Sequence, residues 1–86
     1  MPENTPTPEQ VQQHISAAFD SVNLINGIIA GTNMANATLE NKKETVNRNV
    51  KHLELMMSKT WFVDGCTSTQ VTNINNCIVD GNTYVG

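Results

Sequence analysis

The chain has few charged residues, few aromatic residues and only two cysteines. Charged side chains make up 15% of its 86 residues, and the formal net charge of −3 excludes the basic surface that duplex nucleic acids require. Two cysteines are too few for a disulfide scaffold. No apolar run approaches the roughly 18 residues of a membrane-spanning helix, so we expect no membrane partner. The first residues lack the basic region and the apolar core of a signal peptide.

Asparagine and threonine supply most of the polar character. The chain contains twelve asparagines and ten threonines, about a quarter of its residues. A surface of amides and hydroxyls with a low net charge lets copies of a protein approach one another closely. A compositional bias of the host genome is the alternative explanation. The length allows one small domain.

Residues 1–7 contain two prolines and predict an extended N-terminal arm. Thr7, Pro8 and Gln10 combine three features of a helix start: a capping hydroxyl, a proline in the first turn and the second half of a capping box. A helix is therefore expected over residues 8–30. Its apolar residues recur at spacings of three and four, as in a coiled-coil seam. This seam consists of Val11, Ile15, Ala18, Val22, Ile25 and Ile29.

Two further helices are expected. After Gly31 and a connector of small residues, Thr38 or Asn36 can cap a helix over residues 39–62. Its seam consists of Leu39, Val46, Val50, Leu53, Met57 and Trp61.

The sequence from Thr67 to Gln70 is a second capping box and predicts a helix over residues 68–80. Gly81 is expected to end that helix, which leaves a tail over residues 81–86. The predicted fold is all-α, with residues 8–80 as a single helical domain. It consists of a long antiparallel helical hairpin with a coiled-coil-like seam, plus a short third helix.

The predicted hairpin has more apolar side chains than one seam can bury. A domain of this size buries only about 60–65% of the surface that its unfolded chain exposes, so its own core gives it a small stability margin. We therefore expect the surplus to contact copies of the chain or a larger protein. The predicted contact residues are Leu24, Ile28, Leu55, Met56, Trp61 and Phe62.

The sequence offers few candidate catalytic or metal-binding side chains. A zinc site would need His14, His52, Cys66 and Cys77 to converge from different elements, and their spacing does not favour this. Cys66 precedes a predicted helix start, where a thiolate would be stabilised, but no third group of a nucleophilic site is evident. We expect no enzyme activity, no cofactor and no metal. The alternative ligand site is a nucleotide-binding group formed by Arg48, Lys51, His52 and Trp61.

The stretch from Val46 to Phe62 reads VNRNVKHLELMMSKTWF, an amphipathic segment that ends in a Trp-Phe pair. It resembles a segment of small uncharacterised helical proteins of tailed bacteriophages. The predicted helices from Gln10 to Ile29 and from Thr67 to Ile78 are also similar to theirs. The resemblance implies a phage origin and carries no catalytic residues.

The leading hypothesis is a non-enzymatic structural protein, a minor virion component such as a capsid decoration protein or a tail-associated protein. Its partners would be copies of itself or a larger virion protein. It would be found in the virion, or in the host cytoplasm before assembly. The first alternative is an oligomeric anti-defence protein that sequesters a nucleotide signal. The second is a small regulator that binds a host protein.

Overall fold

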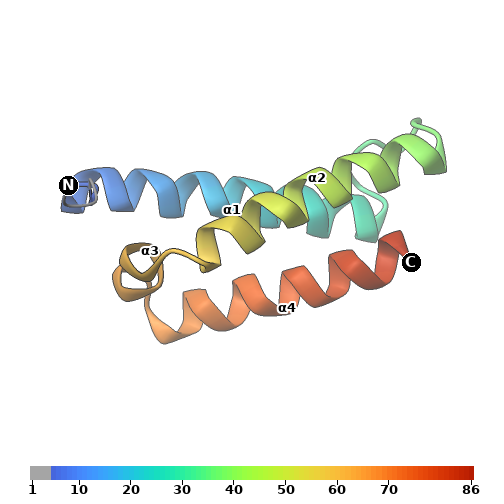
Figure 1. The fold of residues 1–86 in the computed structure, drawn as a ribbon. Helices are drawn as coiled ribbons and strands as arrows, with labels where there is room; N and C mark the ends of the chain where they lie inside the picture. Colours follow the sequence, from blue (N-terminus) through green and yellow to red (C-terminus); the bar gives the residue numbers. More distant parts are fainter. Residues whose placement is uncertain (1–4) are drawn as a thin grey trace.

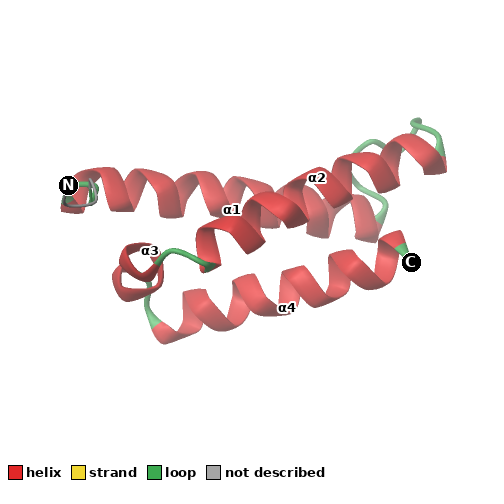
Figure 2. Cartoon of the chain, viewed as in Figure 1, coloured by secondary structure: helices red, strands yellow, loops and turns green. Residues whose placement is uncertain are grey.

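A computed structural model describes residues 5–86. This part of the chain contains four helices and no strand: α1 (Pro8–Ala30), α2 (Leu39–Met57), α3 (Thr60–Gly65) and α4 (Ser68–Val85) (Figures 1 and 2). The prediction of an all-α fold is confirmed. Most of the predicted arm over residues 1–7 lies outside the described residues, and residues 5–7 are not helical.

The three long helices form an up-down-up bundle (Figure 1). α1 and α2 run in opposite directions and pack against each other, which agrees with the predicted antiparallel hairpin. α4 runs back beside both helices, parallel to α1, and the short α3 turns the chain between α2 and α4. The body measures 45 × 27 × 20 Å. In the described part of the chain, none of the helices is long and apolar enough to cross a membrane.

Local capping interactions set the helix starts. The Thr7 hydroxyl accepts a hydrogen bond from the Gln10 backbone N–H, and the Gln10 side chain accepts one from the Thr7 N–H at 3.0 Å. Thr67 and Gln70 form the same reciprocal pair before α4, and Thr38 caps α2. These interactions satisfy N–H groups that have no partner within the helix, and they confirm the predicted starts.

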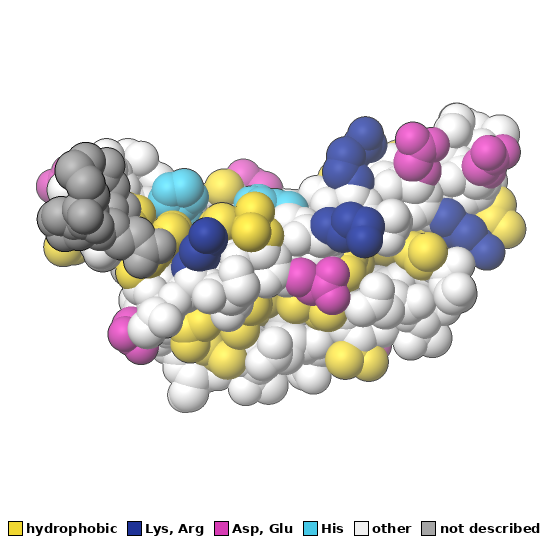
Figure 3. Space-filling model, viewed as in Figure 1, with side chains coloured by type: hydrophobic (Ala, Val, Ile, Leu, Met, Phe, Trp, Pro, Cys, Tyr) yellow, Lys and Arg dark blue, Asp and Glu magenta, His cyan; other side chains and the backbone are white. Residues whose placement is uncertain are grey.

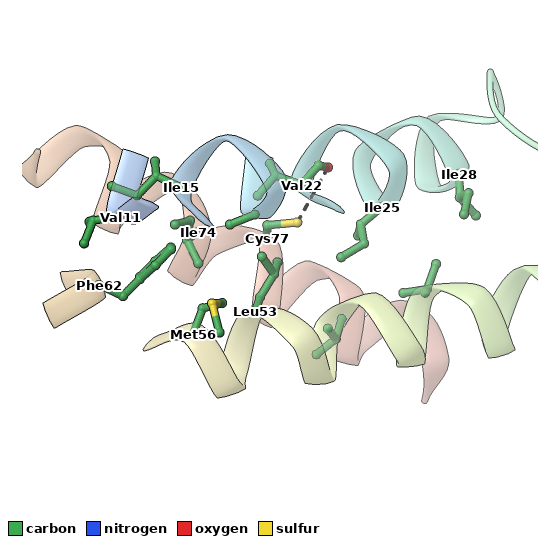
Figure 4. Packing of buried hydrophobic residues seen from close by; sticks show 13 residues of the cluster. Val11, Ile15, Val22, Ile25, Ile28, Leu53, Met56, Phe62, Ile74 and Cys77 are labelled. Atoms are coloured by element: carbon green, nitrogen blue, oxygen red, sulfur yellow. Dashed lines mark hydrogen bonds between the residues drawn. The ribbon is translucent and has the colours of Figure 1, made fainter. Parts of the chain in front are cut away.

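The core is apolar and draws on all four helices (Figure 4). On α1 the buried stripe agrees with the prediction as far as Ile25, but the next buried residue is Ile28 rather than Ile29. On α2 the same shift buries Met56 more deeply than Met57, and Leu39 is exposed. A straight α-helix has 3.6 residues per turn, so a buried stripe drifts away from a strict heptad.

The predicted helix over residues 39–62 is wrong at its C-terminal end. α2 stops at Met57, where the Ser58 hydroxyl donates to the Leu55 carbonyl at 2.6 Å, and Lys59 adopts extended backbone angles. The chain then re-enters a helix in a new direction as α3. This turn brings Phe62 into the core, where its side chain is 0% exposed.

The helix predicted over residues 68–80 begins where predicted, but its end at residue 80 and the tail over residues 81–86 are wrong. α4 continues through Gly81 to Val85. Gly81 is buried, and a Cβ atom at this position would overlap the Val50 side chain of α2 and touch Ile25 of α1. The missing side chain therefore permits close packing of three helices here, rather than ending α4.

Candidate interaction surfaces

Three of the six predicted contact residues belong to the chain's own core. Ile28, Met56 and Phe62 are buried at the junctions between α1, α2, α3 and α4 (Figure 4). The prediction that they contact a partner is wrong for these three, because buried side chains have almost no surface to offer. α3 and α4 cover most of the apolar surplus that the two-helix hairpin would have left exposed.

The other three predicted contact residues reach the surface. Leu55 is 54% exposed on α2, while Leu24 on α1 and Trp61 on α3 are half-buried. Between Leu24 and Leu55, the Ser21 hydroxyl on α1 and the His52 Nδ1 atom on α2 form a hydrogen bond of 3.0 Å. Leu24 follows Ser21 by one helical turn, and Leu55 follows His52 by one turn. Both leucines therefore lie beside the junction of α1 and α2.

The four residues of the alternative ligand site do not form one cluster. Arg48 and Lys51 are exposed on α2, and His52 is held by Ser21. The Trp61 ring packs instead on His14, with ring centroids 5.2 Å apart. His14 precedes Ser21 by two helical turns, about 10 Å along α1. Because Trp61 packs on His14 while His52 is hydrogen-bonded to Ser21, Trp61 lies a similar distance along the bundle from His52 and the neighbouring cationic residues.

Positive charge is confined to one segment. All five Lys and Arg residues lie between Lys42 and Lys59, in α2 and the turn that follows it. α2 also carries Glu40, Glu44 and Glu54, and Figure 3 shows dark-blue and magenta side chains interspersed on this side of the molecule. α1 and α4 contain no Lys or Arg and carry Glu9, Asp20 and Asp80.

A groove of about 340 Å³ runs between α1 and α4. At its base lie Phe19, which is half-buried, and the buried residues Val22 and Cys77, so most of its accessible lining is polar. Its walls carry four exposed asparagines and one carboxylate: Asn23 and Asn26 on α1, and Asn73, Asn76 and Asp80 on α4. Sequence reasoning missed this groove. The available signal was the recurrence of asparagine at intervals of three residues on both helices, which places each set on one helical face.

A second groove of about 340 Å³ lies beside Trp61 where the chain enters α1. Pro6, Pro8 and Val11 form its apolar wall. Gly65 at the end of α3 packs against Val11 so closely that a Cβ atom would overlap the valine side chain. The groove therefore lies beside the contact between α3 and the start of α1.

Both cysteines are free thiols. Burial raises the pKa of the Cys66 thiol, so the stabilised thiolate expected at this position is wrong. Cys77 is 2% exposed, and its thiol donates a weak hydrogen bond to the Val22 carbonyl at 3.8 Å (Figure 4). Burial and the nearby Asp80 carboxylate raise its pKa to about 11. Within residues 5–86, no group of three His, Cys, Asp or Glu side chains could hold a metal ion.

Comparisons with family models, with curated proteins and with solved structures found no match for this chain.

Proposed function

We propose that this chain is a non-enzymatic structural protein that packs against copies of itself in a larger assembly. The observation that carries the proposal is Leu55, a large aliphatic side chain that is 54% exposed on α2. An isolated exposed leucine is common on protein surfaces. Here it accompanies a low net charge and a surface rich in neutral amides, which together weaken repulsion between copies.

The size of the domain supports the same proposal. Three helices of 18 to 23 residues enclose a single narrow core, and the aliphatic residues Leu39 and Leu55 remain exposed on α2. Association adds buried apolar area that a chain of this length cannot obtain by itself, so it stabilises the folded state by mass action. The resemblance of residues 46–62 to phage proteins makes a virion the proposed assembly, with the chain as a minor component.

The proposal is tested by substituting the exposed leucine. Leu55→Asp is expected to shift a self-associating chain to a monomer of 9.4 kDa in sedimentation velocity at micromolar concentration. The reason is that a carboxylate at the contact loses apolar burial and must be desolvated. Helix content in circular dichroism is expected to stay unchanged, because Leu55 is outside the core.

Val79→Asp is the matched control. Val79 is 62% exposed on α4, so the substitution introduces the same charge at a similarly accessible aliphatic position. We expect the Val79 variant to associate like the wild type. A wild-type chain that stays monomeric at all accessible concentrations, or a Leu55 variant that associates normally, contradicts the proposal. Mass spectrometry of purified phage particles tests the virion assignment, which requires the chain at a constant copy number.

A further inference from the structure

The groove between α1 and α4 places polar side chains of the two helices opposite each other. The helices run in the same direction, and the Cys77 thiol lies 3.8 Å from the Val22 carbonyl oxygen, so these two residues stand at the same level of the bundle (Figures 1 and 4). Asn23 follows Val22 and Asn76 precedes Cys77, and both line the groove. The two asparagines therefore lie on opposite walls at one level.

The same arrangement continues one helical turn to each side. Toward the C-terminal ends of the helices, Asn26 lies opposite Asp80, and toward their N-terminal ends Phe19 lies opposite Asn73. Seven residues of α1 separate Phe19 from Asn26, so the groove extends about 10 Å along the helix.

The four asparagine side chains of the groove are available to a ligand. All four are exposed, and within residues 5–86 none of their amides is hydrogen-bonded to another protein group. Each amide offers an oxygen acceptor and two N–H donors. A hydroxyl group also both donates and accepts, so a ligand with several hydroxyls can pair with amides of both walls at once.

The charge of the groove disfavours anionic ligands. Among the described residues that line it there is no Lys, Arg or His, and Asp80 is the one charged group. A phosphate or a carboxylate would find no cation there and would be repelled by the Asp80 carboxylate. A neutral polyhydroxyl ligand avoids that repulsion, and its hydroxyls can donate charge-assisted hydrogen bonds to Asp80.

Phe19 provides the one accessible apolar surface of the groove. Its side chain is half-buried, so part of the ring reaches the groove, whereas Val22 and Cys77 are buried beneath it. A sugar ring has hydroxyls around its edge and C–H groups on its faces, and these C–H groups pack favourably on an aromatic ring. The groove thus combines one aromatic surface with surrounding neutral hydrogen-bonding groups.

We propose that the α1–α4 groove binds a neutral saccharide of two sugar units. Asn23 and Asn76 bond to its hydroxyls from opposite walls, Asp80 accepts from a hydroxyl at one end, and Phe19 packs on a C–H face at the other. The groove volume of about 340 Å³ is within the range of small-ligand sites. No residue of α2 lines the groove, so this site is separate from the proposed Leu55 contact.

Nuclear magnetic resonance of the ¹⁵N-labelled full chain tests the proposal, because asparagine side chains give NH₂ signals of their own. The probes are maltose, cellobiose, lactose and N,N′-diacetylchitobiose. At least one of them is expected to shift the Asn23 and Asn76 side-chain signals saturably, with a Kd on the order of 1 mM. Leu55→Asp, titrated in parallel, is expected to bind the same disaccharide equally well.

Groove variants locate the binding site. Asn23→Ala and Asn76→Ala are each expected to raise the Kd ~5-fold or more, because each loses hydrogen bonds to the saccharide. Phe19→Leu keeps an apolar side chain but removes the ring, and it is expected to raise the Kd ~3-fold or more. Asn75→Ala is the matched control, since Asn75 is an exposed asparagine of α4 that does not line the groove. Circular dichroism checks that each variant keeps its helix content.

The possible outcomes separate this inference from the proposed function. The saccharide site is overturned if none of the four disaccharides gives a saturable shift at ~50 mM. Equal Kd values for Asn76→Ala and the wild type overturn it as well. Binding of spermidine without binding of any disaccharide also overturns it, and would show that the groove takes a cation. Saccharide binding by a wild-type chain that is monomeric supports this site and contradicts the proposed self-association.

Discussion

Gly81 illustrates how one residue controls the distance between helices. It lies inside α4, where glycine costs about 1 kcal/mol relative to alanine in intrinsic helix propensity. The position nevertheless requires glycine, since α4 crosses Val50 and Val46 of α2 at this point with no room for a side chain. The closer packing of α4 against α2 and α1 offsets the cost in helix propensity.

Gly81→Ala is therefore expected to destabilise the fold despite the better helix propensity of alanine. The added methyl group overlaps the Val50 side chain, and such overpacking typically costs about 1–3 kcal/mol. The free energy of unfolding in urea measures the effect. Asn82→Ala, at the exposed neighbouring position of the same helix, is the control and is expected to be neutral or slightly stabilising. A Gly81 variant as stable as the wild type would show that α2 and α4 can separate at little cost.

Cys77 makes stability depend on pH in the alkaline range. Its thiol has a pKa of about 11 in the folded chain, compared with 9.0 for an unperturbed thiol. The folded state thus holds the proton more tightly than the unfolded state. The resulting stabilisation is fully present below pH 9 and is lost as the pH rises from about 9 through about 11.

This dependence is measured by urea unfolding of the wild type and of Cys77→Ala across that pH range. The variant is expected to be less stable at neutral pH, since it leaves a small cavity, but to lose less stability between pH 9 and pH 11. Cys66→Ala is the control, because Cys66 is only half-buried. Equal alkaline slopes for the wild type and Cys77→Ala would contradict this assignment.

At the scale of elements, α3 is a short helix with a large effect on the core. It spans six residues and has no side-chain cap, so it is not stable by its own hydrogen bonds. Its position is maintained by Phe62, which is wholly buried, and by the packing of Trp61 on His14. The two aromatic rings of α3 also contact each other edge to face, with ring centroids 6.3 Å apart.

Phe62→Ala is expected to destabilise the chain by about 3–5 kcal/mol, because it leaves a cavity where α3 meets the bundle. For a domain of this size that is a large part of the total stability. Chemical denaturation measures the loss, and Leu55→Ala is the control that is expected to change stability little. For the same reason, Phe62→Asp cannot report on association, since the variant is expected to unfold. A loss of stability below about 1 kcal/mol in Phe62→Ala would show that the core closes around the missing ring.

The starts of the three long helices and the end of α1 at Ala30 were predictable from sequence, whereas the ends of α2 and α4 were not. The capping boxes at Thr7 and Thr67 involve residues three apart, so local chemistry is enough to locate them. The end of α2 and the continuation of α4 through Gly81 depend on packing between helices. The same limit explains the contact residues. Phe62 was predicted to be exposed to a partner because the path of α4 and α3 around it cannot be inferred from periodicity.

At the scale of the whole molecule, charge is expected to contribute little to the proposed self-association. α2 carries four cationic side chains and three carboxylates, Glu40, Glu44 and Glu54, so it has no strong charge of one sign. Ion pairs at the exposed rim of a contact contribute only about 0–1 kcal/mol each, while burial of Leu55 contributes without dependence on salt.

Self-association is therefore expected to weaken by less than ~10-fold when the salt concentration rises from about 0.05 M to about 0.5 M. Sedimentation equilibrium over a range of salt concentrations measures this change. Complete dissociation at the higher salt concentration would contradict the role given to Leu55 and would mean that charge alone holds the copies together.

The up-down-up path of the chain places the start of α1 and the end of α4 at opposite tips of the bundle (Figure 1). Pro8 begins α1 at one tip, and Val85 finishes α4 at the other. A fluorophore attached next to Val85 would hence project from that tip, away from Leu55 near the C-terminal end of α2. Labelling at that position offers a way to follow the proposed association in real time without blocking it.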